Sequence, residues 1–422
     1  MAINPWRGLK NLPRELWILC TALLVNRAGL MALPFLVLYL TRSLGIPPGR
    51  AALALIVYGA GALITAPLSG RLSDRVGAHG VLKWSLFLSG GILLLFPLAR
   101  SFGAILATTF FWAILGEAGR PASFSIIADL VAPEQRKPAF ALGRLALNLG
   151  TSVGPAVGGF LALISFHALF LVDGATSILA GAVLALAPWR ASRQVQAQPA
   201  DSIWNEPSEL AREIEAEGGA PLPSPPARDL SVFVNPRLAY FLAALLPVHL
   251  VIFQLLSALP LFLVRHLGLP EAVYGLVFTV NTLMIVLIEV PLNTAMAHWP
   301  HRWALALGAL LYGAGYGALA FTSHTAGVAA TVVVWTFGEM ILLPGSAAYI
   351  AEIAPAEKRG QYMGFYAMSF NLAFLLGPWI GAQILERSGP QVLWSITFLS
   401  GCVSALLMTR IHPTAATAAA GD

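Results

Sequence analysis

The sequence predicts an all-α polytopic membrane protein with twelve transmembrane helices in two pseudo-symmetric six-helix bundles. Its 422 residues are 57% hydrophobic and only 11% charged, whereas soluble domains carry about 25% charged residues. Apolar runs of about 20 residues, long enough to cross a bilayer as a helix, recur from one end to the other. These runs are continuous and do not alternate with a period of two, which argues against a β-barrel. The second half of the chain also repeats the first.

Apolar windows bounded by charged residues, proline or glycine predict the twelve spans. The first apolar run is too long for the core of a signal peptide and no cleavage site follows it, so we count it as a span. The spans are expected near 15–41, 51–69, 82–99, 103–129, 138–164, 167–188, 237–264, 271–296, 303–321, 326–351, 361–385 and 391–409.

The spans divide the chain into an N-terminal six-helix bundle (1–188), a linker (189–236) and a C-terminal six-helix bundle (237–422). The linker is rich in proline, alanine and acidic residues and carries no visible binding motif. We interpret it as a solvated cytoplasmic connection between the bundles, and a regulatory site is the alternative.

The distribution of basic residues predicts the orientation in the membrane. If both termini are cytoplasmic, most Lys and Arg residues fall on the cytoplasmic side. Those expected on the other side are Arg42, Arg50, Arg100, Arg265 and Arg387. This asymmetry predicts a multi-pass protein of the inner cell membrane with both termini in the cytoplasm. The net charge of +5 therefore gives no argument for a nucleic-acid partner.

An internal repeat links the two halves at a spacing of 223 positions. The segment NLGTSVGPAVGG recurs without gaps as NLAFLLGPWIGA, and IADLVAPEQR recurs as IAEIAPAEKR. The aligned ranges are 148–159 with 371–382, 127–136 with 350–359 and, after a three-residue difference upstream, 32–34 with 258–260. One six-helix unit is thus used twice, as in transporters that rock two halves about a site near the membrane midplane.

Glycine and proline inside the fifth span need an explanation, because they cost a helix about 1 and 3 kcal/mol. Gly150, Gly154 and Gly158 lie four residues apart and form a smooth helix face with Gly159 beside it. Such a face lets the span approach a neighbouring helix closely, and Pro155 is expected to bend it. The second copy of the segment keeps a glycine–proline pair, so we prefer this interpretation to an incidental small-residue face.

The same segment and one loop carry a resemblance to a known family. The stretch GRLSDRVGAHG (70–80), between spans two and three, resembles the loop motif G-x-L-x-D-R-x-G-R-K of the major facilitator superfamily. GTSVGPAVGG resembles the span-five motif of the drug/proton antiporters in that superfamily. The resemblance covers almost the whole chain and implies the major facilitator fold, and export rather than uptake. Span four has Trp112 about where the family has an arginine, and span one lacks the carboxylate that several exporters use.

The resemblance also implies a conformational latch. In the family, the aspartate of the loop motif lies against a helix N-terminus and bonds to nearby arginine, which closes the cytoplasmic side. The residues expected to form the latch here are Gly70, Asp74, Arg75, Gly77, Asp129 and Arg136. An ordinary surface ion pair is the alternative.

Ionisable residues within the spans are candidates for proton coupling, since a charge there costs at least about 2.5 kcal/mol. The candidates are Glu117, Glu339, Glu289 and Asp173. We prefer Glu117 or Glu339, with Arg27 or Arg120 adjusting the balance between the carboxylic acid and the carboxylate. Glu117 and Arg120 lie three residues apart on one helix face, so they could instead only neutralise each other. Glu289 could be structural beside Pro291.

Cations, amides and aromatic residues in the spans are candidates for lining a substrate cavity. They are Arg27, Arg120, Gln254, Asn281, Trp335 and Tyr366. Each aromatic residue has packing or contact with lipid as its alternative role.

We therefore expect a secondary active transporter, namely a proton-coupled exporter (antiporter) of amphipathic drug-like or small metabolite compounds, of the multidrug-resistance type. The alternative is a proton-coupled symporter or facilitator for a specific polar or anionic metabolite, although the intramembrane arginines suit a zwitterion equally. The sequence has no nucleotide-binding loop G-x-x-x-x-G-K-[ST], no H-E-x-x-H and only scattered histidines, so we expect no enzyme, no metal and no cofactor. The expected partners are a small-molecule substrate, protons and the lipid bilayer, with the protein acting as a monomer.

Overall fold

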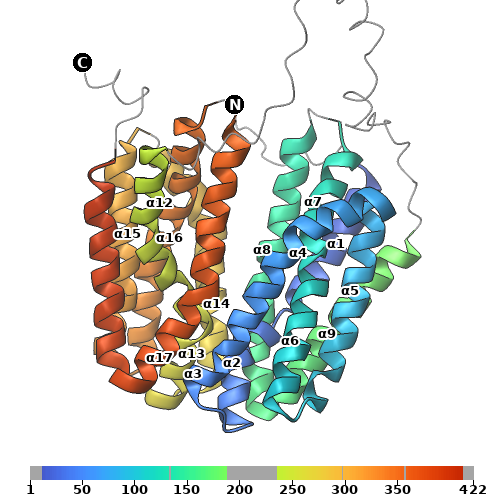
Figure 1. The fold of residues 1–422 in the computed structure, drawn as a ribbon, viewed down its shortest axis with the longest axis horizontal. Coiled ribbons are helices and arrows are strands. Elements are labelled where there is room, and N and C mark those ends of the chain that lie inside the picture. The colour runs from blue at the N-terminus through green and yellow to red at the C-terminus, as the bar shows by residue number, and fades with distance from the viewer. Residues whose placement is uncertain (1–11, 133–134, 188–234, 297, 356–357, 412–422) are drawn as a thin grey trace, which may run out of the picture.

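The computed structural model describes residues 12–132, 135–187, 235–296, 298–355 and 358–411. Over these residues the regular secondary structure is entirely helical. Eleven helical segments are long and apolar enough to cross a membrane, and one of them, Gln361–Met408, has 48 residues. Within it Gly389 adopts φ 84° and ψ 173°, a conformation that favours glycine, and Pro390 follows. The chain reverses there (Figure 1), so the described residues make the twelve predicted spans.

The first six spans include three that are interrupted. In chain order the six spans are α1 (Arg14–Ala28) with α2 (Ala32–Arg42), α3 (Pro48–Ala51) with α4 (Leu53–Val76), α5 (Ala78–Leu95), α6 (Phe102–Glu117) with α7 (Gly119–Leu130), α8 (Arg136–Ile164) and α9 (Phe166–Leu186).

The last six spans also begin with an interrupted span. They are α12 (Pro236–Ile252) with η5 (Phe253–Leu256), α13 (Ala258–Leu261) and the π-helical turn η6 (Phe262–His266), then α14 (Glu271–Ala295), α15 (His301–Ala318), α16 (Thr325–Ile353) and the two spans of α17 (Arg359–Met408). Most of the expected linker lies in 188–234, outside the described residues.

The first span of each half is broken at an equivalent position. Met31, between α1 and α2, has φ −131° and ψ −22°, and Ser257, which the repeat aligns with it, has φ −133° and ψ −70°. The glycine-rich segments pack against these breaks. A Cβ on Gly154 would lie 2.8 Å from the carbonyl oxygen of Arg27, and one on Gly377 would lie 3.0 Å from that of Leu250. A larger residue could not approach so closely.

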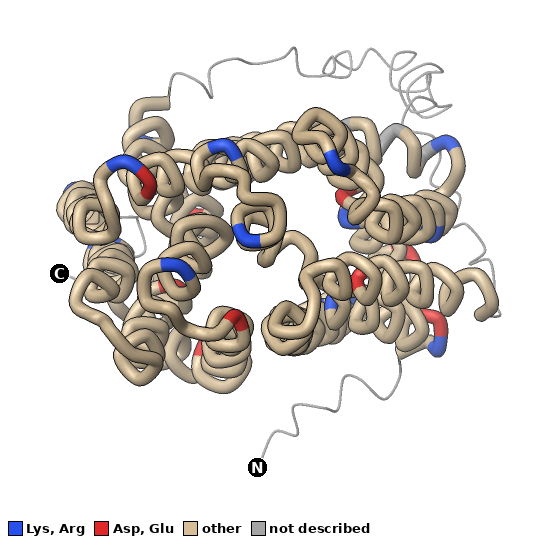
Figure 2. Tube along the Cα trace, turned by 90° about the horizontal axis from the view of Figure 1, so that it is seen from below, with Lys and Arg blue, Asp and Glu red and all other residues tan. Residues whose placement is uncertain are grey.

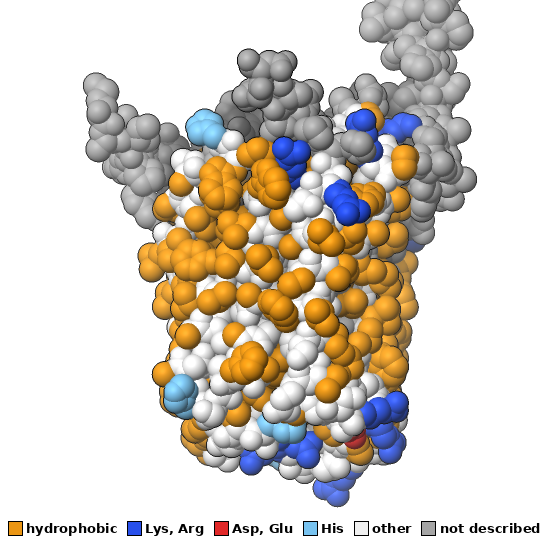
Figure 3. Space-filling model, turned by 90° about the vertical axis from the view of Figure 1, so that its left-hand side faces the viewer, with side chains coloured by type: hydrophobic (Ala, Val, Ile, Leu, Met, Phe, Trp, Pro, Cys, Tyr) orange, Lys and Arg blue, Asp and Glu red, His pale blue; other side chains and the backbone are white. Residues whose placement is uncertain are grey.

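The two groups of helices lie side by side, with few charged residues along them (Figures 1 and 2). Large apolar side chains face outward over most of the height of the molecule, and Lys and Arg gather towards its two ends (Figure 3). Leu287 is 70% exposed and Phe321 is 91% exposed, which only a lipid environment makes favourable. The protein is therefore a multi-pass membrane protein.

The two halves are tied together at the end opposite the termini. Arg42 forms an ion pair with Glu271 at 2.7 Å, and the amide of Gly49 donates to Glu386 at 2.7 Å. The Tyr274 hydroxyl donates to the Pro34 carbonyl at 3.1 Å. Towards the end that carries the termini the two groups of helices diverge (Figure 1). The ribbons of the two groups thus lie closest together at the end opposite the termini.

Candidate functional site

A cavity of about 530 Å³ lies between the two halves. This volume suits a drug-sized molecule. The first half contributes residues from α4, α6 and α7, namely Gly59, Ala62, Leu63, Glu117, Arg120 and Pro121. The second half contributes residues from α16 and α17, namely Leu343, Met363, Tyr366, Ala367, Phe370, Asn371 and Phe374. One wall therefore carries charge, whereas the facing wall is mainly apolar and aromatic.

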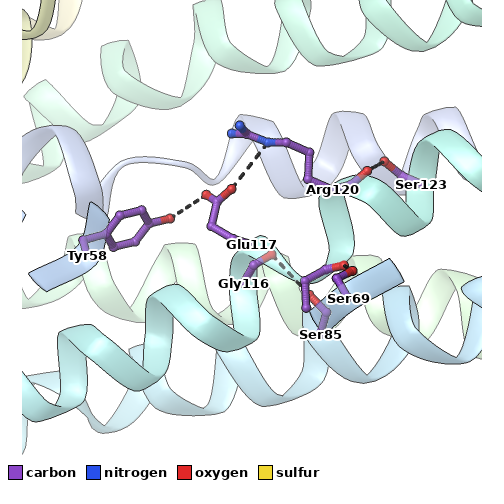
Figure 4. Close-up of polar contacts among 8 residues, drawn as sticks. Tyr58, Ser69, Ser85, Gly116, Glu117, Arg120 and Ser123 are labelled. Atoms are coloured by element: carbon purple, nitrogen blue, oxygen red, sulfur yellow. Dashed lines mark hydrogen bonds and ion pairs between the residues drawn. The ribbon is translucent and has the colours of Figure 1, made fainter. Parts of the chain in front are cut away.

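Glu117 is the centre of the charged wall (Figure 4). Its Oε1 accepts a hydrogen bond of 2.9 Å from the Tyr58 hydroxyl, and its Oε2 lies 3.5 Å from Nε of Arg120. The Glu117 side chain is 19% exposed and that of Arg120 is 57% exposed. The contact drawn in Figure 4 runs from Nε of Arg120 to the carboxylate. The expected pairing within the helix is therefore present, but only as a long, single contact.

The junction between α6 and α7 sets these positions. Ala118 separates the two helices, and the Ser69 hydroxyl on α4 donates to its carbonyl at 2.7 Å. The Ser85 hydroxyl on α5 donates to the Gly116 carbonyl at 3.3 Å. A Cβ on Gly119 would lie 2.8 Å from the Ser85 oxygen. Neighbouring helices thus hold the junction that places Glu117 and Arg120 against the cavity (Figure 4).

Arg27 lies in the last turn of α1, next to the break in the first span. Its side chain forms no hydrogen bond or ion pair within the part of the chain that the structure describes. The charges that act on it are those of Arg120, Glu117 and Asp173. Its place at a helix C-terminus is favourable for a cation. Arg27 therefore adds an unpaired positive charge near the charged wall.

Asp173 has a different environment from the cavity. It lies on α9, is 2% exposed, and its Oδ2 accepts hydrogen bonds from the backbone N–H groups of Met31 (3.1 Å) and Ala32 (3.0 Å). These groups are the free donors at the N-terminus of α2, where an acidic group is stabilising. The carboxylate thus holds the broken first span together. Its proposed part in proton coupling stays a prediction.

Glu339 occupies a second polar site, inside the second half. Its Oε2 accepts a hydrogen bond of 2.8 Å from Asn281 on α14, and the same amide donates to Thr336 at 3.1 Å. No basic side chain pairs with Glu339 among the described residues. At the repeat spacing Asn281 aligns with Tyr58, so the partner of each carboxylate occupies the same position in its half.

The remaining predicted residues are dispersed. Glu289 lies 3.5 Å from Arg144, across the boundary between α14 and α8. Trp335 is 1% exposed and stacks on Tyr316, with ring centroids 4.4 Å apart. Gln254 donates to the carbonyls of Leu250 and Gly377, both at 2.9 Å. None of these residues lines this cavity. Of the six predicted lining residues, the structure brings Arg120 and Tyr366 to it.

The latch residues make no ion pair within the described part of the chain. Arg75, Asp129 and Arg136 are exposed, and Gly77 ends α4 with φ 81°. The side chain of Asp74 is not among those that the structure describes. Because the halves diverge at this end, a latch that closes it is not expected to be engaged here, and its role stays a prediction.

His249 is a residue that the sequence reasoning missed. It is fully buried on α12, and among the described residues neither ring nitrogen has a hydrogen-bond partner. Its ring lies 5.3 Å from that of Phe370 and 6.0 Å from that of Tyr366, both of which line the cavity. The alignment of 32–34 with 258–260 places Leu23, a core residue, at the equivalent position. A histidine in place of a core leucine was the available signal.

Comparison with known proteins agrees with this architecture. The family model of the Major Facilitator Superfamily matches residues 19–270 and 248–420. A Na(+), Li(+), K(+)/H(+) antiporter of Planococcus maritimus is 24% identical over 375 residues, which cover 84% of this chain and 85% of that protein. The quinolone resistance protein NorA of Staphylococcus aureus is 25% identical over 150 residues, 36% of this chain and 38% of that protein.

A solved D-xylose-proton symporter has the same fold, with a TM-score of 0.73 at 15% identity over 94% of this chain and 97% of that chain. These matches thus include an antiporter, a quinolone resistance protein and a symporter. The protein is accordingly a transporter and not an enzyme, and the chain belongs to the major facilitator superfamily.

Proposed function

We propose that the protein exports amphipathic small molecules in exchange for protons, by alternating access of the cavity between its halves. The observation that carries this proposal is the cavity itself, with ionisable side chains on one wall and aromatic side chains on the other. A compound with a polar group and an apolar body would complement both walls. The span-five motif and the antiporter and efflux relatives support exchange and export.

We assign the proton to Glu339 and the substrate to the wall formed by Glu117 and Arg120. Glu339 has an amide partner but no counter-ion among the described residues, and a buried carboxylate without one is costly in its charged form. Taking up a proton removes that cost. Glu117 has Arg120 beside it and a hydroxyl donor, which stabilise its charged form.

The closed end and the diverging end fit one state of an alternating-access cycle. We propose that both termini are cytoplasmic and that the protein acts as a monomer in the cell membrane. The present conformation then faces the cytoplasm, from which substrate would enter. The proton gradient supplies the free energy, so no nucleotide or other cofactor is required.

Transport in proteoliposomes tests this proposal. A panel of amphipathic cations, zwitterions and organic anions is offered under an imposed pH gradient, with a pH-sensitive dye inside the vesicles. We expect one class of compound to accumulate while protons move in the opposite direction. Movement of protons and compound in the same direction would replace the exporter with a symporter. Transport that is insensitive to the gradient would remove proton coupling.

A further inference from the structure

The cavity also indicates the charge of the substrate. We propose that it is an amphipathic organic anion, whose carboxylate or similar oxyanion binds the terminal nitrogens of Arg120 while its apolar body lies on the aromatic wall. This inference rests on the proposed transport function and specifies its substrate class.

The first argument is the charge of the cavity. On the first-half wall Arg120 carries one positive charge and Glu117 one negative charge, and Arg27, which does not line the cavity, adds a second positive charge that interacts with both. The residues that line the second-half wall include no acidic or basic side chain. The site therefore has a net positive charge close to an apolar surface, where an uncompensated charge is costly. An anionic group would compensate it.

The second argument is the geometry of Arg120. Its only ionic contact within the described residues is the 3.5 Å approach of Nε to Glu117. That contact uses Nε and not a terminal nitrogen, and the side chain is 57% exposed. A guanidinium group binds a carboxylate best through two parallel hydrogen bonds. Arg120 has this capacity free.

The third argument excludes a cation from the same place. Each oxygen of Glu117 already has a neighbour, since Oε1 accepts from Tyr58 and Oε2 faces Arg120. An ammonium group approaching this carboxylate would also approach Arg120 and Arg27, and like charges repel. The site therefore favours an anion over a cation of the same shape.

The internal repeat shows that the two walls differ by substitution. At the repeat spacing Arg120 aligns with Leu343, and both residues line the cavity, one on each wall. The same backbone position thus supplies a charged group on one side and an apolar group on the other. A molecule with an anionic head and an apolar body fits this arrangement.

Equilibrium binding to the purified full-length protein tests the inference without a gradient. The probes are 1-naphthaleneacetate, 1-naphthaleneacetamide and 2-(1-naphthyl)ethylamine, which share an aromatic body and carry an anionic, a neutral and a cationic head. We expect calorimetry to give a Kd for the acetate about tenfold lower than for the amide or the amine, because a charge-assisted bidentate pair forms only with the acetate. Equal binding of all three, or tighter binding of the amine, would overturn the inference.

Variants locate the effect. Arg120→Gln should remove the preference for the acetate. Arg120→Lys should keep part of it, because lysine retains the positive charge but cannot form two parallel hydrogen bonds to a carboxylate. Arg144→Gln is the matched control, since Arg144 is also an exposed arginine that approaches a glutamate at 3.5 Å but does not line the cavity. Its preference should equal that of the wild type. An unchanged preference in folded Arg120→Gln would contradict the assignment.

Binding and transport separate this inference from the proposed function. A preference for the acetate with no proton-driven transport would leave the inference intact and refute the exporter. Proton-driven export of the amine, with no binding of the acetate, would support the exporter and refute the inference that the substrate is an anion.

Discussion

The sites at Glu117 and Glu339 occupy nearly the same place in the two halves, yet their surroundings differ. Each carboxylate bonds to a residue at one repeat position, Tyr58 in the first half and Asn281 in the second. In the fourth span of each half, however, Glu339 aligns with Gly116, one residue before Glu117. Neighbouring residues on a helix point about 100° apart, since 3.6 residues make a turn. This one-residue shift accompanies the change from a site at the cavity to a site inside a helix bundle.

The largest effect should come from Glu339→Gln. It removes the group that we assign to the proton while keeping its size and a hydrogen-bonding oxygen, so pH-driven transport should fall by more than about tenfold. Binding of substrate at equilibrium should persist, because Glu339 does not line the cavity. Flux under an imposed pH gradient, with binding measured in parallel, checks both statements. Normal pH-driven flux in a folded variant would move the proton to another residue.

Glu117→Gln should have the opposite pattern. It removes the negative charge beside Arg120, so an anionic probe should bind several-fold more tightly, while proton-driven flux changes less than in Glu339→Gln. Titration calorimetry with 1-naphthaleneacetate measures the first effect. If Glu117→Gln abolished proton-driven flux instead, the assignment of the two carboxylates would be reversed.

Asp173→Ala should destabilise the protein by about 2–3 kcal/mol. It leaves two buried N–H groups at the break in the first span without their charged acceptor, and such groups are costly when unpaired. Thermal unfolding in detergent measures the loss. Ser177→Ala, on the same helix as Asp173, removes one hydrogen bond donated by Asn26 of α1 and is the milder control. Equal melting temperatures for the two variants would contradict this role of Asp173.

His249→Leu should have the smallest effect, a gain in stability of about 1 kcal/mol. The change removes two buried nitrogens without partners and introduces the residue found at the equivalent position, Leu23. Thermal unfolding again provides the measurement, with His324→Leu at an exposed helix N-cap as the control that should gain nothing. A marked loss of stability would mean that the imidazole has a partner in the membrane-embedded protein.

The number of spans and the repeat could be predicted from the sequence because hydrophobic length and segment identity are local properties. That Glu117 and Arg120 lie on the same side could be predicted from their spacing of three residues. The role of Asp173 could not be predicted, since Pro34 and its repeat counterpart Pro260 mark the break in the first span but not which carboxylate lies beside it. Trp335 and Gln254 looked like cavity residues because composition does not say which side of a helix faces the neighbouring half.

The contacts of α8 have a kinetic consequence. Gly154 lies against the broken first span, near Arg27, while a Cβ on Gly159 would lie 2.8 Å from Ala272 of α14 in the other half. One helix therefore touches both the neighbourhood of the charged wall and the opposite bundle. A change at Arg27 cannot shift this helix without disturbing the contact across the boundary. We expect bulky residues at Gly159 to slow the exchange between the two open states more than they weaken the binding of substrate.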